Sequence, residues 1–250
     1  MLLIFSDLDA TLLDHESYSF EKAIPALDRL KKNQFPLILT SSKTRAEMIH
    51  IQKQLGIKDP FIFENGSGIF FNTVQNRGVT HKEIINTLFT LKQHFNFKLF
   101  SEFSLEDLEK LVGLDQKACE RAQNRQFSEP VIWKDKEDLK PKFQDLLSQK
   151  NLIAQQGGRF LTISGNQTKA DALLWVKNKY QSSQNSKIFT IGLGDSENDI
   201  SMLERCDYAV LIKHPTKPSP KINHSNLIET KQVGPAGWND AINELLDQYE

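Results

Sequence analysis

The sequence has little cysteine and no long apolar run. Only two cysteines occur in 250 residues, Cys119 and Cys206, and they lie far apart without the spacing of metal ligands. This pattern predicts free thiols in a reducing cytoplasm rather than a disulfide framework. The opening apolar stretch, residues 1–5, is too short to cross a membrane and lacks the basic segment of a signal peptide. We therefore expect a cytoplasmic protein without a membrane partner.

The sequence also lacks an excess of either charge. Lysine and arginine total 31 against 32 for aspartate and glutamate, which gives a formal net charge of −1. A protein that holds a nucleic-acid backbone normally carries a basic field, so no nucleic-acid partner is expected. No internal repeat or low-complexity tract is present either, which excludes solenoid architectures.

Apolar residues make up 39% of the chain and charged residues 25%, as in globular proteins. Strand-like runs alternate with amphipathic helical stretches toward both ends of the chain. The expected strands are 2–5, 35–39, 61–63, 188–191 and 208–212, and the expected helices are 20–32, 45–55 and 196–204. This alternation predicts an α/β fold, with a mostly parallel sheet covered by helices on both faces.

The middle of the chain has a different pattern. Helical stretches are expected at 81–94, 105–111 and 116–125, and strands at 131–133, 152–155 and 160–164. Strands with helices on one face are typical of a separate α+β unit. We therefore expect an inserted domain at 81–165 between two parts of the α/β core, 1–80 and 166–250.

Acidic residues follow two of the predicted core strands. Asp7 and Asp9 come directly after the first strand, and Asp195 and Asp199 follow the strand at 188–191. Ligands bind open parallel sheets at the carboxyl ends of the strands, and clustered carboxylates favour a hard cation such as Mg²⁺. Taken alone, a single Asp-x-Asp is more often a helix or turn cap. The second acidic strand end makes that alternative less attractive.

These segments resemble the motifs of the haloacid-dehalogenase (HAD) phosphatases. Residues 5–13 resemble the first motif, whose usual form is Asp-x-Asp-Gly-Thr, although Ala10 stands where the family has glycine. Residues 194–199 resemble the Gly-Asp-x-x-Asn-Asp motif without departure. Thr40-Ser41-Ser42 and Lys169 match the two remaining motifs, in the proper order. An insertion between the second and third motifs is similar to a class IIB α/β cap, so the resemblance implies a Rossmann-like core with that cap.

The resemblance also implies roles for individual residues. Asp7 would attack phosphorus and form an aspartyl-phosphate, while Asp9 would act as the general acid and base. Mg²⁺ would be held by Asp7, the main-chain carbonyl of Asp9 and Asp195, with Asp199 binding through water or orienting Lys169. The phosphoryl oxygens would be held by Ser41, with Ser42 as the adjacent possibility, and by Lys169 and Asn198.

Further segments resemble the mannosyl-3-phosphoglycerate phosphatases in particular. They are 41–47, 63–66, 125–130, 157–160 and 234–238. The resemblance implies a sugar attached to phosphoglycerate as the substrate, with arginines on its carboxylate and carboxylates or amides on sugar hydroxyls. The expected substrate-binding residues are Lys43, Glu64, Asn65, Arg125, Glu129 and Arg159. For each charged residue taken singly, a surface ion pair is the alternative.

Other functions remain open at this point. One alternative is a HAD phosphatase for glucosyl-3-phosphoglycerate, a hexose phosphate or another sugar phosphate; a phosphomannomutase with the same cap is less favoured. A regulatory phosphate-binding module of receiver type needs a phosphorylated aspartate but no acid–base partner and no large insertion. Asp9 and the segment 81–165 therefore argue against such a module.

Overall fold

The computed structural model describes residues 1–157, 160–183 and 187–249. Within these residues, eight strands form one sheet, in which all neighbours are parallel except along the β3–β4–β5 edge. In sheet order the strands are β12 (Leu227–Val233), β11 (Tyr208–Lys213), β10 (Phe189–Gly194), β1 (Leu2–Ser6), β2 (Leu37–Thr40), β3 (Phe61–Phe63), β4 (Gly68–Phe71) and β5 (Thr73–Asn76).

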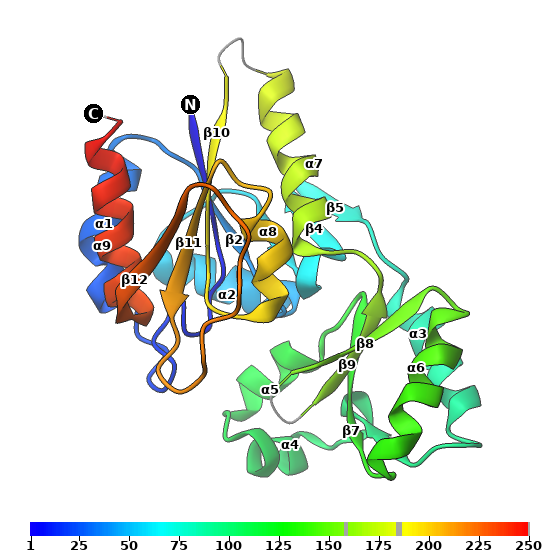
Figure 1. The fold of residues 1–250 in the computed structure, drawn as a ribbon. Coiled ribbons are helices and arrows are strands. Elements are labelled where there is room, and N and C mark those ends of the chain that lie inside the picture. The colour runs from blue at the N-terminus through cyan, green and yellow to red at the C-terminus, as the bar shows by residue number, and fades with distance from the viewer. Residues whose placement is uncertain (158–159, 184–186, 250) are drawn as a thin grey trace.

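Helices cover both faces of this core sheet, because its central strands are apolar on both sides. In β1, Leu2 and Ile4 join one buried cluster, and Leu3 and Phe5 join the other. The first cluster is closed by α1 (Ile24–Lys32), α2 (Arg45–Leu55) and α9 (Gly234–Asp247), and the second by α7 (Lys169–Ser182) and α8 (Ile200–Leu203). Figure 1 shows α1 and α9 on one side of the sheet and α7 and α8 on the other.

The middle of the chain forms a second unit, called the cap below. Its antiparallel sheet has the order β6 (Phe97–Leu99), β7 (Ser128–Trp133), β9 (Leu161–Gly165) and β8 (Leu152–Gln156). Helices α3 (His81–Leu91) and α6 (Lys140–Ser148) pack on one face of it, while α4 (Leu105–Val112) and α5 (Gln116–Gln123) form a small cluster of their own. The expected fold class is thereby confirmed: a mostly parallel α/β core carries a separate α+β cap.

Short 3-10 helices connect several of these elements. They are η1 (Glu21–Ala23), η2 (Glu64–Gly66), η3 (Phe100–Glu102), η4 (Glu137–Leu139) and η5 (Glu197–Asp199). Two larger features were not expected from the sequence, the β4–β5 hairpin and the terminal pair β12–α9. Both β5 and β12 are edge strands with largely exposed, polar side chains, so they lack the apolar runs that mark the central strands.

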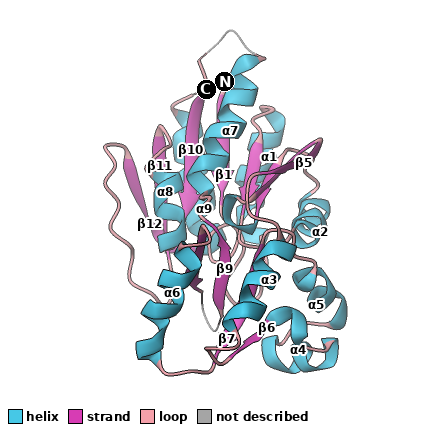
Figure 2. Ribbon diagram, turned by 90° about the vertical axis from the view of Figure 1, so that its right-hand side faces the viewer, coloured by secondary structure: helices cyan, strands magenta, loops and turns pink. Residues whose placement is uncertain are grey.

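The cap lies beneath the carboxyl ends of the parallel core strands (Figure 2). The two chain segments that join cap and core run side by side, since a Cβ atom added to Gly165 would lie 3.2 Å from the backbone nitrogen of Val79. This arrangement brings the polar face of the cap sheet toward the edge where Asp7 and Asp195 lie. Among the described residues, no helix combines the length and the apolar character that a bilayer crossing needs.

Candidate active site

Parallel strands bring residues from distant parts of the sequence to one edge of the core. Asp7 follows β1, and its backbone nitrogen donates to the carbonyl of Leu193 on the neighbouring strand β10 at 2.9 Å. Asp195 follows β10, and Thr40 ends β2 on the other side of β1. Their convergence follows from sheet order, as is typical of ligand sites in open α/β sheets.

Lys169 is the centre of the charged cluster at this edge. Its Nζ lies 2.7 Å from Asp7 Oδ1, 2.7 Å from Asp199 Oδ1 and 3.4 Å from the Thr40 carbonyl oxygen. Thr168 caps α7 with its side chain, so Lys169 begins the helix and extends into the core with 1% exposure. Burial alone would lower the pKa of Lys169, but Asp199 and Asp7 outweigh it and raise the pKa. The lysine is therefore a fixed positive charge.

The acidic residues exceed what this lysine neutralises. Asp7, Asp195 and Asp199 are buried, and one carboxylate oxygen of each lies within 4.8 Å of the others. Burial raises the pKa of Asp7 well above its usual range, and burial together with Asp199 raises the pKa of Asp195 to about 6. Three carboxylates against one ammonium leave a surplus of two negative charges in a buried site. Hard oxygen donors with this surplus fit a divalent cation such as Mg²⁺.

Asp199 has a second structural use. Its Oδ2 accepts hydrogen bonds from the backbone nitrogens of Asp195 and Ser196, each at 3.2 Å, while its Oδ1 contacts Lys169. Asp199 thus closes the loop after β10 and orients the lysine. Asp195 is held in turn by Thr11, whose Oγ1 donates to Asp195 Oδ1 at 3.0 Å.

Asp9 points to a different partner from Asp7. Its Oδ1 lies 2.9 Å from Lys43 Nζ, and this pairing outweighs burial to raise the pKa of Lys43. Directly after Asp9, Ala10 has φ 59°, in the left-handed region that glycine adopts freely. The alanine therefore occupies the family's glycine position in the glycine conformation.

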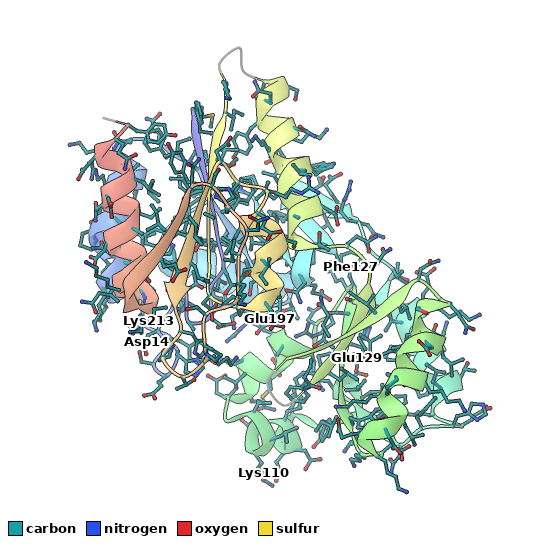
Figure 3. The ribbon with its side chains drawn as sticks, viewed as in Figure 1. Asp14, Lys110, Phe127, Glu129, Glu197 and Lys213 are labelled. Atoms are coloured by element: carbon teal, nitrogen blue, oxygen red, sulfur yellow. The ribbon has the colours of Figure 1, made fainter. Side chains whose placement is uncertain are left out.

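A cavity of about 750 Å³ extends from the acidic cluster to the cap. Its core wall includes Asp7, Asp9, Ser42, Asn65 and Asn198, and its cap wall includes Gln155, Gln156 and Thr162. The alternation of β9 explains the cap wall, since Leu161 and Ile163 enter the cap's apolar cluster and Thr162 faces the opposite way. Figure 3 shows Glu197, another lining residue, at the end of the core that faces the cap.

The predicted phosphate-binding serines are neighbours with different exposures. Ser41 is 1% exposed, and its Oγ accepts a hydrogen bond from the backbone nitrogen of Lys43 at 3.2 Å. Ser42 lines the cavity. Asn198 also lines the cavity, with its Nδ2 3.5 Å from Asn65 Oδ1. Among the described residues that were predicted to bind substrate, Asn65 is thus the one that lines the cavity.

Glu64 and Glu129 do not line this cavity. The Glu64 carboxylate accepts hydrogen bonds from the backbone nitrogens of Gln126 and Phe127, both at 2.9 Å, and from Ser128 Oγ. It therefore fastens the cap to the core. Glu129 Oε1 accepts from Ser101, and Glu129 Oε2 lies 2.7 Å from His81 Nε2 inside the cap. In both cases the carboxylate is buried, and groups of the protein occupy the oxygens that were expected to accept sugar hydroxyls.

The predicted arginines are also separated from one another. Arg125 Nη1 donates to the Ser42 carbonyl at 3.3 Å and to Ser128 Oγ at 2.9 Å, which places it at the junction between cap and core. Arg159 lies outside the described residues. Phe127, next to this junction, is buried in the core cluster with its ring 5.8 Å from that of Phe63. Phe127 is a packing residue.

A known protein family covers most of the chain. Residues 4–218 match the model of the haloacid dehalogenase-like hydrolases. The chain belongs to this family. A curated relative from Persephonella marina, named glucosyl-3-phosphoglycerate/mannosyl-3-phosphoglycerate phosphatase, is 36% identical over 266 aligned positions, which cover 100% of this chain and 98% of the relative.

Solved structures of the haloacid dehalogenase superfamily share the fold. A phosphatase from Bacteroides thetaiotaomicron matches with a TM-score of 0.72 at 17% identity, covering 98% of this chain and 94% of that one. A sugar phosphatase of subclass IIB matches with a TM-score of 0.67 at 13% identity, covering 100% of this chain and 99% of that one. At these identities the likeness concerns the fold, which includes both the core and the cap of this hydrolase.

Several residues at the site of this hydrolase were given no individual role from the sequence. Thr11 lies in the first motif but received no role. His15, His214 and Lys217 line the cavity from loops without a recognisable motif. Trp238 is fully buried, and its Nε1 donates to Ser6 Oγ at 2.9 Å, while Ser6 Oγ donates to the Asp7 carbonyl at 2.7 Å. For these residues the sequence offers one indication, the three prolines after His214, which are typical of a rigid segment.

Proposed function

We propose that this hydrolase is a Mg²⁺-dependent phosphoric monoester hydrolase that converts mannosyl-3-phosphoglycerate to mannosylglycerate and phosphate. The observation that carries the proposal is the position of Asp7. Its buried carboxylate is held by Lys169 and lines a cavity that continues to a polar cap wall. Such a site presents a nucleophile and a fixed cation to a phosphoryl group, and leaves room for a large polar leaving group. The phosphatase name of the 36%-identical relative supports the same substrate class.

The proposed reaction uses Asp7 and Asp9 in turn. A carboxylate oxygen of Asp7 attacks phosphorus, the bond between phosphorus and the ester oxygen of the glycerate breaks, and Asp9 gives a proton to that departing oxygen. Asp9 then takes a proton from a water that attacks the aspartyl-phosphate, which releases phosphate and restores Asp7. Lys169, Asn198 and the serine pair at 41–42 bind the phosphoryl oxygens, because phosphoryl transfer depends mainly on positioning and charge stabilisation.

Mg²⁺, held by Asp7, Asp195 and the Asp9 carbonyl, would supply positive charge beside the phosphoryl group. The surplus of negative charge in the acidic cluster supports this requirement. Asp199 orients Lys169 and keeps the loop after β10 closed. The segment 81–165 is proposed to act as the cap that encloses the leaving group, with Gln155 and Thr162 as hydrogen-bonding residues for the sugar.

A second candidate substrate is glucosyl-3-phosphoglycerate. It is favoured by the name of the Persephonella marina relative, which includes both sugars. The two substrates differ in the configuration of one sugar hydroxyl, so the side chains of Gln155 and Thr162 would decide between them. The phosphoryl end of the site would treat both alike.

Phosphate release from a panel of substrates tests the proposal. The panel contains mannosyl- and glucosyl-3-phosphoglycerate, hexose phosphates and p-nitrophenyl phosphate, each with a chelator and with Mg²⁺ restored. We expect the highest kcat/KM for a glycosyl-3-phosphoglycerate, no turnover in chelator, and no turnover by Asp7→Asn. Preference for a simple hexose phosphate would overturn the proposed substrate, and full turnover in chelator would overturn the Mg²⁺ requirement.

A further inference from the structure

The loop between β11 and β12 forms one wall of the active-site cavity. His214, Lys217, Pro218, Ser219 and Pro220 all line it. Among the described residues that line the cavity, Lys217 is the sole lysine or arginine, and its side chain is exposed. None of the ion pairs found in the described part of the chain includes it. The ammonium of Lys217 is therefore available to a bound molecule.

The loop that carries Lys217 is built rigidly. His214 is 5% exposed, and its Nδ1 accepts hydrogen bonds from the backbone nitrogens of Thr216 and Lys217, both at 3.1 Å. Its ring also packs edge-on against His15, with centroids 5.0 Å apart. Pro215, Pro218 and Pro220 restrict the remaining backbone. The imidazole and the prolines fix the position from which Lys217 reaches the cavity.

The other lysines and the arginine that the structure describes near the cavity have partners. Lys169 is bound by Asp7 and Asp199 at the phosphoryl end. Lys43 is paired with Asp9, and Arg125 donates to groups at the cap junction. The cavity wall itself includes four acidic side chains, those of Asp7, Asp9, Asp195 and Glu197. A substrate with a second negative group would be repelled by this wall unless a cation met that group.

We infer that Lys217 binds the carboxylate of the leaving group, so that the acidic part of the substrate lies against the core loop and its sugar lies toward strands β8 and β9. This inference rests on the proposed function, because it assumes a leaving group that contains both parts. If Lys217 has this role, the residue that selects substrates with a carboxylate belongs to the core. The sequence had predicted arginines of the cap for this role.

The test pairs a substitution in the enzyme with one in the substrate. Lys217→Met is compared with Lys213→Met, an exposed lysine at the end of β11 that does not line the cavity (Figure 3). The substrates are mannosyl-3-phosphoglycerate, its carboxamide and p-nitrophenyl phosphate. Loss of one charged hydrogen bond predicts a fall in kcat/KM of about tenfold to a hundredfold for the carboxylate substrate with Lys217→Met. The other two substrates should change less than about twofold, and Lys217→Arg should restore most of the activity.

The outcomes separate this inference from the proposed function. Equal losses on all three substrates, or no loss on any, would overturn the role of Lys217. If the wild-type enzyme does not hydrolyse mannosyl-3-phosphoglycerate, the proposed substrate is wrong, but the role of Lys217 is not yet refuted. The comparison is then made with 3-phosphoglycerate and glycerol 3-phosphate, which also differ in a carboxylate. A selective loss on 3-phosphoglycerate would still support Lys217 as the carboxylate-binding residue, and its absence would overturn it.

Discussion

Removing the charge of Asp195 should stabilise the metal-free protein. Asp195 is 5% exposed, and burial together with Asp199 raises its pKa from the ordinary 3.8 to about 6. Because the pKa is raised on folding, the folded state binds more protons than the unfolded state between these values. Stability therefore falls as pH rises from about 4 to about 6 and stays reduced above that range. Asp195→Asn removes this penalty and keeps an oxygen that accepts the hydrogen bond from Thr11.

The size of the effect follows from the shift. At pH 8 the ionised Asp195 costs the folded protein about 3 kcal/mol, and at pH 5 about half as much. Urea unfolding in excess chelator, followed by tryptophan fluorescence, should show Asp195→Asn as more stable by up to these amounts. Added Mg²⁺ should raise the free energy of unfolding of the wild type at pH 8 and leave that of the variant nearly unchanged.

Asp14→Asn provides a control of opposite sign. Hydrogen bonds from Ser17 lower the pKa of the exposed Asp14, so its contribution is present above the unfolded pKa and is lost as pH falls. This variant should be slightly destabilised at pH 8. If Asp195→Asn were also destabilised at pH 8 in chelator, the surplus of negative charge would not be a cost. The argument that the cluster requires a cation would then be refuted.

Three further predictions concern residues around the site. Ala10→Gly should raise the free energy of unfolding by about 0.5–1 kcal/mol in urea melts. The backbone strain that alanine has in the left-handed region is removed, and this gain exceeds the cost of glycine's larger unfolded-state entropy. A loss of stability would contradict strain at this position. Glu64→Gln should lower stability by about 2 kcal/mol and speed proteolysis at the cap junction, since one buried backbone donor loses its acceptor; unchanged proteolysis would argue against the fastening role. Trp238→Phe should lower the free energy of unfolding by about 1–2 kcal/mol and lower kcat more than it changes KM. The reason is that the hydrogen bond to Ser6, whose hydroxyl donates to the Asp7 carbonyl, is lost. A change confined to KM would contradict a role of Trp238 in positioning Asp7.

The sequence alone determined the fold class and the acidic residues that meet at the carboxyl-end edge of the core sheet. Alternating apolar strands and helices are a local pattern, and β1, β2, β3, β10 and β11 appeared close to their expected positions. The edge residues Asp7, Asp195 and Thr40 follow strands directly, so sheet topology brings them together without any further information. The edge strands β5 and β12 escaped prediction because exposed polar strands lack an apolar run.

Only the tertiary structure decided how individual charged side chains are used. Glu64 was predicted to bind a sugar, but its hydrogen-bond partners lie 62 to 64 residues further along the chain, at the start of β7. Lys217 attracted no attention in the sequence, because its environment is created by a cavity whose other walls come from the cap and from β1. A charged residue's role depends on which neighbours desolvate or neutralise it, and those neighbours are set by packing between distant segments. Local patterns do not contain that information.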